Sequence, residues 1–335
     1  MRRFLRNSLQ FLLFLGIASL LLWIAFRDMP AESLLEGFRA SNGLLILVAV
    51  GVAFFSYLFR ALRWQLLIAP LGHTPKVRHV FFSVMIGYLA NFLFPRLGEV
   101  ARCGALSRKS AIPVDKLIGT VIIERVVDMA SLLLITLLYT ALRFDFLFGF
   151  IEKTGEYFDM PGNDFLIALF IGLVLLLLGM WVMYRLFKKY FPKGNFRDRL
   201  SKWVHGVTLG LRSLMDLHER WAFLLYTLLI WMSYFFMTYL LFLAIPATAH
   251  LSLADTFFIL VIGSFAFVIP AQGGIGSFHL MISLGLTILG VSRADGLVYA
   301  TLSHGVQSLF AVVLGALSFV LLFSGYRNHS SVQSK

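Results

Sequence analysis

The sequence predicts an all-α, polytopic membrane protein, and three observations support this prediction. Hydrophobic residues make up 59% of the chain and charged residues only 14%, against about a quarter charged in soluble domains. The mean hydropathy is +0.84. The apolar residues form long unbroken runs, whereas strands of a membrane barrel would alternate apolar and polar residues over about 10 positions. Because lipid offers the backbone no hydrogen-bond partner, such runs cross a membrane as helices.

Six apolar runs are long enough to cross a hydrocarbon core of about 30 Å. They lie at about 8–26, 43–66, 117–142, 165–187, 222–245 and 297–324. The first run follows three arginines and resembles a signal peptide in outline, but no small-residue cleavage site follows it, so we expect an uncleaved span. Two shorter runs, 80–94 and 254–269, end at Pro95 and Pro270, and a further run continues to Leu289. We expect both to be re-entrant hairpins.

The distribution of basic residues sets the predicted orientation. With two re-entrant hairpins and the N-terminus inside, the cytoplasmic segments hold 22 of the 29 Lys and Arg residues. The outside segments hold 5 of the 29, beside 10 of the 17 acidic residues. Every loop then obeys the positive-inside rule, whereas a full crossing by the short run 80–94 alone would place the basic loop 185–220 outside. We therefore expect both termini in the cytoplasm.

The same topology divides one membrane domain, residues 1–335, into two halves of opposite orientation. Residues 8–142 would form a first repeat and residues 165–325 an inverted second repeat, broken at corresponding places. Paired interrupted half-spans indicate a transporter-type site near the midplane; a chance pair of broken helices is the alternative. The basic segment 188–220 is either an interfacial helix on the cytoplasmic leaflet or a linker helix packed on the bundle.

The net charge of +12 does not indicate a nucleic-acid partner, because the basic segments lie between apolar runs. Membrane lipids with anionic headgroups are the expected partners, and a homo-oligomer remains open. The single cysteine, Cys103, excludes an internal disulfide and a cysteine-rich metal site. The sequence has no metal-spaced set of His and Cys residues, no Ser-His-Asp signature and no P-loop. We therefore expect no metal, no cofactor and no catalytic residue.

Charged residues gather where the first short run ends. Arg96, Glu99 and Arg102 are three residues apart, so they share one helix face and can pair. A charge at membrane depth costs about 2.5–3.5 kcal/mol on insertion scales, a cost that usually marks function. The alternative is a cluster at a span end whose side chains snorkel to the cytoplasm.

A second charged group lies about a third of the way into the run 117–142. Glu124 and Asp128 are four residues apart and face the same way, and Arg125 is three residues from Asp128. This face must look into the bundle, because lipid would leave its charges unpaired. The carboxylates either hold the hairpin arginines in place or form a structural ion-pair lock.

The third group is a glycine-rich turn after the second short run. Gly273, Gly274 and Gly276 let backbone amides approach a ligand closely, and a helix that starts after them suits an anion such as phosphate. A tight helical break explains the glycines equally well. His279 and His304 either relay protons or bind a headgroup, or they are packing residues.

Four motifs recur in the order and spacing of a known family. They comprise Arg63 and Trp64; Asn91, Pro95, Arg96, Gly98, Glu99 and Arg102; Glu124, Arg125 and Asp128; and Pro270, Gly273, Gly274 and Gly276. Over about 8–325 the chain resembles the lysylphosphatidylglycerol synthase transmembrane family, also called the flippase-like domain family. The resemblance implies a prokaryotic inner-membrane protein that moves a lipid, such as an aminoacylated phospholipid, between leaflets.

Two departures from the family limit this expectation. The resemblance does not include the family's soluble aminoacyl-transfer domain, so it does not imply synthesis of a lysyl-lipid. The family's glycine turn is often followed three residues on by glutamate, and His279 holds that place here.

The expected function is translocation of an anionic or headgroup-modified lipid across the cytoplasmic membrane. Arg96, Arg102 and Arg125 would engage the lipid phosphate, because the planar guanidinium binds phosphate with two hydrogen bonds. The carboxylates of Glu99, Glu124 and Asp128 would orient them. The alternatives are an intramembrane enzyme that transfers or hydrolyses a lipid-linked group, with Glu99 or Asp128 as base, and an accessory subunit of an envelope-lipid pathway.

Overall fold

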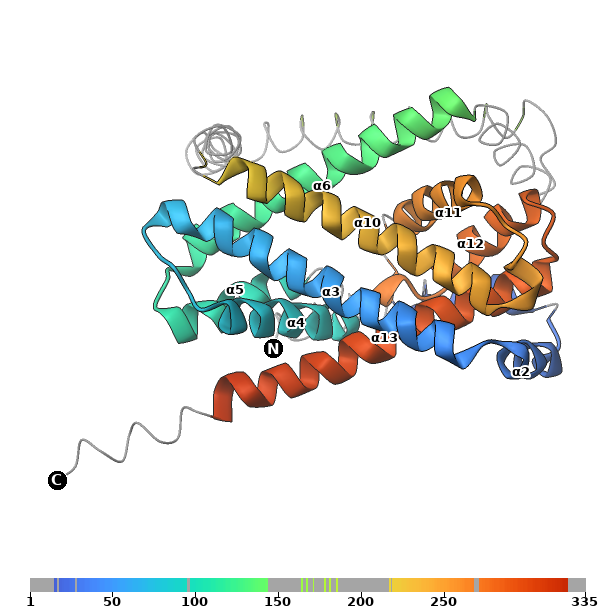
Figure 1. Ribbon diagram of the computed structural model, residues 1–335, viewed down its shortest axis with the longest axis horizontal. Coiled ribbons are helices and arrows are strands. Elements are labelled where there is room, and N and C mark those ends of the chain that lie inside the picture. Colours follow the sequence, from blue (N-terminus) through green and yellow to red (C-terminus); the bar gives the residue numbers. More distant parts are fainter. Residues whose placement is uncertain are drawn as a thin grey trace.

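The computed structural model describes residues 15–27, 29–94, 97–143, 219–267 and 271–324 without residue 17, together with residue 217 and six isolated positions between 164 and 185. These residues are helical, with no strand among them, so the predicted all-α fold is confirmed (Figure 1). Several expected elements lie outside the described residues. They are the start of the first span, Pro95, Arg96, Pro270, most of 165–187 and nearly all of 188–220.

Three helices of the described part are long and apolar enough to cross a membrane. They are α3 (Gly43–Ile68), which the short η1 (Ala69–Leu71) extends, α10 (Arg220–Ala244) and α13 (Arg293–Ser324). The side chain of Asn42 begins α3 by accepting hydrogen bonds from the amides of Leu44 and Leu45, at 3.0 and 3.3 Å. α10 ends just before Pro246, whose ring cannot continue a helix. These helices match three of the spans expected from hydropathy.

The helix α6 (Val114–Leu142) covers the expected run 117–142 as one unit of 29 residues. It differs from the other long helices because Glu124, Arg125 and Asp128 interrupt its apolar sequence. At its far end, the hydroxyl-bearing ring of Tyr139 packs against Phe258 with ring centroids 5.8 Å apart. α6 therefore carries three charged side chains in its interior, away from both of its ends.

The two short apolar runs form helices that are too short to cross a membrane alone. They are α4 (Val77–Leu93) and α11 (Leu253–Ala266), of 17 and 14 residues, or about 26 and 21 Å at the helical rise of about 1.5 Å per residue. After α4 the chain turns into α5 (Gly98–Ser110), and after α11 it passes through η3 (Gln272–Gly274) into α12 (Ser277–Ile288). The chain therefore interrupts both runs near the predicted places.

Two helices extend beyond what the sequence predicted. The sequence placed Arg96, Glu99 and Arg102 on one helix face and counted residues 102–116 among the cytoplasmic segments, whereas α5 continues to Ser110 and packs closely on α4. A Cβ atom on Gly98 would lie 2.3 Å from the carbonyl oxygen of Gly87, so only glycine permits this approach. The second, α2 (Ala31–Ala40), lies in the segment expected outside, where its Gly37 contacts Val298 of α13. Short polar helices of this kind give no hydropathy signal.

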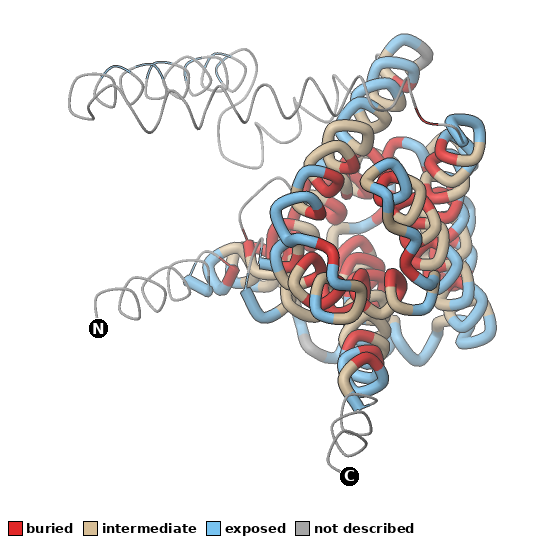
Figure 2. The backbone as a smooth tube through the Cα atoms, turned by 90° about the vertical axis from the view of Figure 1, so that its left-hand side faces the viewer, coloured by how far each residue is buried: buried red, intermediate tan, exposed pale blue. Residues whose placement is uncertain are grey.

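The helices pack around two adjoining cores. One core joins α3, α10, α11, α12 and α13 with Tyr139 of α6, and the other joins α3, α4, α5 and α6 with Phe223 of α10. In Figure 1 α3 and α10 run side by side, and α13 passes along α4. Figure 2 shows that the buried residues face the middle of this bundle, while the ends of the described chain project from it. Because α3 belongs to both cores, its side chains can reach partners in either half.

Candidate functional site

Six charged side chains from three helices meet inside the second core. Arg60 and Arg63 come from α3, Arg102 from α5, and Glu124, Arg125 and Asp128 from α6; we call this set the arginine cluster. In α3 and α6 the charged residues interrupt apolar sequences, and α5 packs Arg102 beside buried Cys103 and Leu106, so packing of the helices brings the charges together. A buried charge must be paired, because isolation from water is otherwise strongly unfavourable.

Glu124 lies at the centre of the arginine cluster, with a side chain that is fully buried. Its Oε1 is 3.1 Å from Nη2 of Arg63 and 3.2 Å from Nη1 of Arg60. Its Oε2 is 2.8 Å from Nη2 of Arg102. One carboxylate therefore holds guanidinium groups from α3 and α5 against α6.

Asp128 lies one helical turn further along α6 and binds the same two arginines of α3. Its Oδ1 is 2.6 Å from Nη2 of Arg63, and its Oδ2 is 3.2 Å from Nη1 of Arg60. Residues three or four apart lie on the same face of a helix. Glu124 and Asp128 therefore share one face of α6, and Arg60 and Arg63 share one face of α3. Two facing pairs of opposite charge thus join α3 to α6.

Neutral side chains fix the orientation of these guanidinium groups. Arg60 donates to the hydroxyl of Tyr234 at 2.7 Å, and Arg63 donates to the hydroxyl of Thr227 at 3.3 Å, both on α10. The guanidinium of Arg102 lies 4.7 Å from the ring centroid of Trp64, whose indole Nε1 donates to Thr120 at 2.9 Å. A guanidinium over an indole ring is a favourable cation–π contact. Hydrogen bonds and stacking therefore preorganise the cluster.

Arg125 is the most accessible member of the arginine cluster. Its side chain is 43% exposed, and its distances to Glu124 and Asp128 are longer than those of the other arginines, at 3.6 and 3.4 Å. The carboxylates are already occupied by Arg60, Arg63 and Arg102 at 2.6–3.2 Å. Arg125 is therefore the least tightly held guanidinium group of the arginine cluster.

The structure brings together four of the six charged residues proposed from the sequence. Arg102, Glu124, Arg125 and Asp128 meet in the arginine cluster, and Arg96 lies outside the described residues. Glu99, on the half-buried side of α5, takes part in no ion pair of the described chain. Glu99 therefore does not pair with Arg102, although the two share a helix face, because Arg102 pairs with Glu124 instead.

Sequence reasoning missed the contribution of α3. Arg63 was noted only as part of a motif, and Arg60 was not noted as a site residue. A signal was present, since two arginines three residues apart interrupt an otherwise apolar run and must share a helix face. Their partners are more than 60 residues away in the chain, at sequence separations of 61 to 68.

The glycine turn forms a second, uncharged polar region. Gly273, Gly274 and Gly276 have φ angles of +60°, +79° and +82°, which glycine adopts readily. Nε2 of His304 lies 2.8 Å from the carbonyl oxygen of Gly273, and the amide of Gly276 donates to Nδ1 of His279 at 3.4 Å. The two imidazole rings lie 5.2 Å apart between phenylalanine rings. The histidines thus bond to the turn itself.

The glycine turn also contacts the break between α4 and α5. The side-chain amide of Gln272 donates to the carbonyl oxygens of Phe92 and Leu93, at 3.1 and 2.9 Å. These carbonyls belong to the last turn of α4 and have no partner within that helix. On the other side of the same break, the amide of Gly98 donates to Asn91 at 2.7 Å. The two interruptions of the chain therefore meet in space.

Packing closes the glycine turn from a further side. A Cβ on Gly276 would lie 2.6 Å from Cβ of Leu21 and 2.8 Å from the carbonyl oxygen of Ala18. Residues 18–26 form a helix that covers the turn, and the ring of Phe26 lies 5.7 Å from that of His279. The backbone amide of Gly276, which was expected to face a headgroup, is thus covered by this helix and donates to His279.

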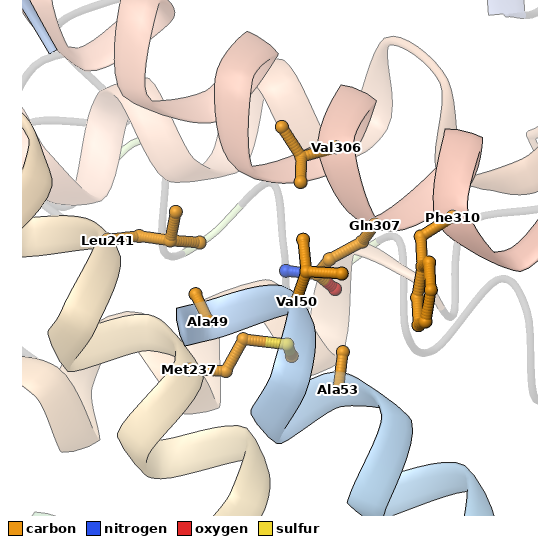
Figure 3. Close-up of a pocket in the computed structure, with 8 residues that line it drawn as sticks. All are labelled: Ala49, Val50, Ala53, Met237, Leu241, Val306, Gln307 and Phe310. Carbon is orange, nitrogen blue, oxygen red and sulfur yellow. The ribbon is translucent and has the colours of Figure 1, made fainter. Parts of the chain in front are cut away.

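A small pocket lies away from both polar regions. It opens between α3, α10 and α13 and is lined by Ala49, Val50, Ala53, Met237, Leu241, Val306, Gln307 and Phe310 (Figure 3). Gln307 supplies the only polar side chain of this lining.

The described residues also contain no group of three His, Cys, Asp or Glu side chains that could hold a metal ion.

Comparisons with known proteins agree with this membrane-embedded arrangement. A family model described as "Lysylphosphatidylglycerol synthase TM region" matches residues 11–315. A segment of 96 residues is 32% identical to the "UPF0104 membrane protein MJ1595" of Methanocaldococcus jannaschii. This segment is 28% of the present chain and 26% of that protein, so the match spans about a quarter of the relative's length. No solved structure matches the chain.

Proposed function

The chain belongs to the family of lysylphosphatidylglycerol synthase transmembrane regions, and from this premise we propose that it moves an anionic or headgroup-modified lipid between the leaflets of the cytoplasmic membrane. The arginine cluster is the observation that supports this proposal. Its charged side chains are positioned by three helices of an apolar bundle and are not at a helix end. Charges at such depth mark substrate or ion pathways in membrane proteins.

The depth of the arginine cluster follows from helix geometry. Arg60 lies eight residues before the end of α3 at Ile68, and Glu124 lies ten residues after the start of α6 at Val114. At about 1.5 Å per residue these distances are about 12 and 15 Å. A hydrocarbon core is about 30 Å thick, so a headgroup bound at the cluster would lie near the middle of the bilayer.

The arrangement suits a phosphate group that binds and leaves. Arg125 would bind the phosphate oxygens from its exposed side, since a guanidinium matches phosphate geometry with two donors. Glu124 and Asp128 hold the remaining guanidinium groups in place before the lipid arrives, which lowers the ordering cost of binding. The acyl chains would stay in the bilayer while the headgroup passes the cluster.

An inverted repeat with two re-entrant hairpins would place the cluster on a path open to both sides. The short helices α4 and α11 and the contact of their breaks through Gln272 support this proposed topology. In transporters with inverted repeats, discontinuous helices meet near the midplane. Both termini would then lie in the cytoplasm.

The topology is tested with single cysteines in a Cys103→Ser background. Cysteines at 34 and 293 should react with an impermeant thiol reagent from outside, and cysteines at 76, 109 and 205 should not. Outside labelling at 205 would contradict the two hairpins, because it requires an odd number of crossings before that loop.

Translocation is tested with purified protein in liposomes that contain a fluorescent phospholipid. Dithionite quenches only the outer leaflet, so protein-dependent movement raises the quenched fraction above that of protein-free liposomes. We expect Arg125→Gln to slow this movement and the exposed Arg108→Gln on α5 to leave it unchanged. A new lipid species on thin-layer chromatography, without redistribution, would instead favour an enzyme.

A further inference from the structure

We infer that the lipid bound by the arginine cluster carries two negative charges and no ammonium group on its headgroup, as a phosphomonoester or a diphosphate does. This inference rests on the proposed function and specifies the substrate class of the same site. Three features of the cluster lead to it. They are the net charge, the unpaired hydrogen-bond donors, and the guanidinium nitrogen that lies beside each carboxylate oxygen.

The charge balance of the arginine cluster is positive by two. Four guanidinium groups, from Arg60, Arg63, Arg102 and Arg125, face two carboxylates, from Glu124 and Asp128. Four positive and two negative charges leave +2. Within the described chain, no third carboxylate enters these ion pairs. Since uncompensated charge is strongly unfavourable inside a bilayer, the site is complementary to a ligand with two negative charges.

Hydrogen-bond donors of the arginine cluster are also left over. The buried Nε–H groups of Arg60, Arg63 and Arg125 and Nη2 of Arg102 have no hydrogen-bond acceptor in the described structure, whereas Oε2 of Glu124 is the one acceptor of the cluster that lacks a donor. Buried polar groups are normally paired, so unpaired donors on one site indicate an acceptor that is not part of the chain. Phosphate oxygens are acceptors of this kind, and each can receive more than one hydrogen bond.

Each carboxylate oxygen of the cluster already lies beside a guanidinium group. Both oxygens of Glu124 and both oxygens of Asp128 are within 3.2 Å of a guanidinium nitrogen, although Oε2 of Glu124 forms an ion pair with Arg102 and no hydrogen bond. An ammonium group that approached them would have to displace an arginine and would also meet the excess positive charge. The site is therefore unsuited to lysyl or ethanolamine headgroups, which the family resemblance alone would have allowed.

The phosphate type follows from the number of charges to be compensated. A phosphodiester such as phosphatidylglycerol carries one negative charge and would leave +1 at the site. A phosphomonoester carries close to two charges at pH 8, since its second pKa is about 6, and a lipid-linked diphosphate diester carries two. Either would bring the occupied cluster to neutrality.

The test compares three lipids with identical acyl chains at pH 8. The probes are phosphatidic acid (monoester), phosphatidylglycerol (diester) and phosphatidylethanolamine (zwitterion). Thermal stabilisation of the detergent-purified protein by their dihexanoyl forms measures binding, and dithionite quenching of their fluorescent forms measures movement. We expect phosphatidic acid to bind about tenfold more tightly than phosphatidylglycerol, the effect of one charge-assisted hydrogen bond, and phosphatidylethanolamine to bind most weakly.

A charge-changing variant checks that the preference arises from the arginine cluster. Arg125→Gln lowers the excess to +1 and should bring the affinities for phosphatidic acid and phosphatidylglycerol close together. Arg108→Gln removes one exposed charge outside the cluster and should keep the tenfold preference. Melting temperatures without lipid show that both variants are folded.

The outcomes separate this inference from the proposed function. Equal binding of monoester and diester by the wild-type protein, or a preference that Arg125→Gln leaves intact, would overturn the inference even if lipids move. Preferential binding of phosphatidic acid without movement of any probe lipid would support the inferred headgroup class and refute translocation.

Discussion

The arginine cluster and the glycine turn are both buried polar regions, yet they satisfy their polar groups in different ways. The cluster joins α3, α5 and α6 through full charges, and it keeps a net charge and unpaired donors. The glycine turn uses neutral groups, and its own histidines and Gln272 bond to backbone atoms of the turn and of α4. In the turn, Oε1 of Gln272 also lacks a partner among the described residues, but the turn carries no excess charge. We therefore propose that the cluster recognises the lipid and that the turn joins segments of the chain.

The largest expected effect is the loss of the central carboxylate of the cluster. Glu124→Gln removes the negative charge that faces Arg60, Arg63 and Arg102, so three buried guanidinium groups lose a counter-ion. Breaking a buried ion pair by removing one partner destabilises a protein by about 3–5 kcal/mol. We expect a large drop in melting temperature, measured on the purified variant in detergent.

Glu99→Gln is the matched control, because Glu99 is on the neighbouring α5 and joins no ion pair of the described residues. Substitutions away from such features usually change stability by no more than about 0.5 kcal/mol. If Glu99→Gln destabilised the protein as much as Glu124→Gln, the loss of stability could not be attributed to the ion pairs of the arginine cluster. Lost translocation in a well-folded Glu99→Gln protein would instead place Glu99 in the lipid path.

The second prediction separates charge from shape within the cluster. Arg102→Lys keeps the positive charge beside Glu124 but loses the planar stacking on Trp64. The loss should be about 1.5–3 kcal/mol, the scale of a charged hydrogen bond, which slows translocation by about one to two powers of ten. The same reasoning applies to Arg96→Lys if Arg96 binds the lipid. Wild-type rates in a folded Arg102→Lys protein would remove Arg102 from the mechanism.

The third prediction tests the turn as a joint. Gln272→Leu removes two hydrogen bonds to the end of α4, each of which contributes about 0.5–1.5 kcal/mol. The melting temperature should fall, while the preference among lipid headgroups should not change. Gln307→Leu in the apolar pocket is the control and should be neutral or stabilising. A changed headgroup preference in Gln272→Leu would show that the turn also recognises lipid.

The smallest expected effect concerns His304. His304→Leu removes the bond to the carbonyl oxygen of Gly273 and should destabilise by about 1 kcal/mol. If the histidine pair is only part of the joint, the ratio of wild-type to variant translocation rates should stay constant between pH 6 and 8. A ratio that varies strongly with pH would show that His279 and His304 couple protons to movement, and would break the division between the two regions.

Several features of the fold were predictable because they depend on local sequence. The long helices α3, α10 and α13 were expected within a few residues, since an apolar run of that length can only bury its backbone bonds as a helix. The interruptions near residues 95 and 270 followed from proline and glycine. The helix α2 was missed and α5 was expected only around Arg102, because their charged residues prevent a long apolar run.

The sequence by itself indicated that the helix face with Glu124 and Asp128 looks into the bundle, because lipid cannot stabilise an isolated charge, and it left open whether Arg102 does so. Only the tertiary structure decided which charges pair. It brought Arg60 and Arg63 of α3 against α6 and left Glu99 aside, because pair distances depend on how apolar helix faces pack and not on spacing along one helix. It also closed the glycine turn on its own histidines and on Gln272. The excess positive charge of the site is therefore a property of the packed bundle, since it is the sum of two positive charges from α3, one positive charge from α5 and a net negative charge from α6.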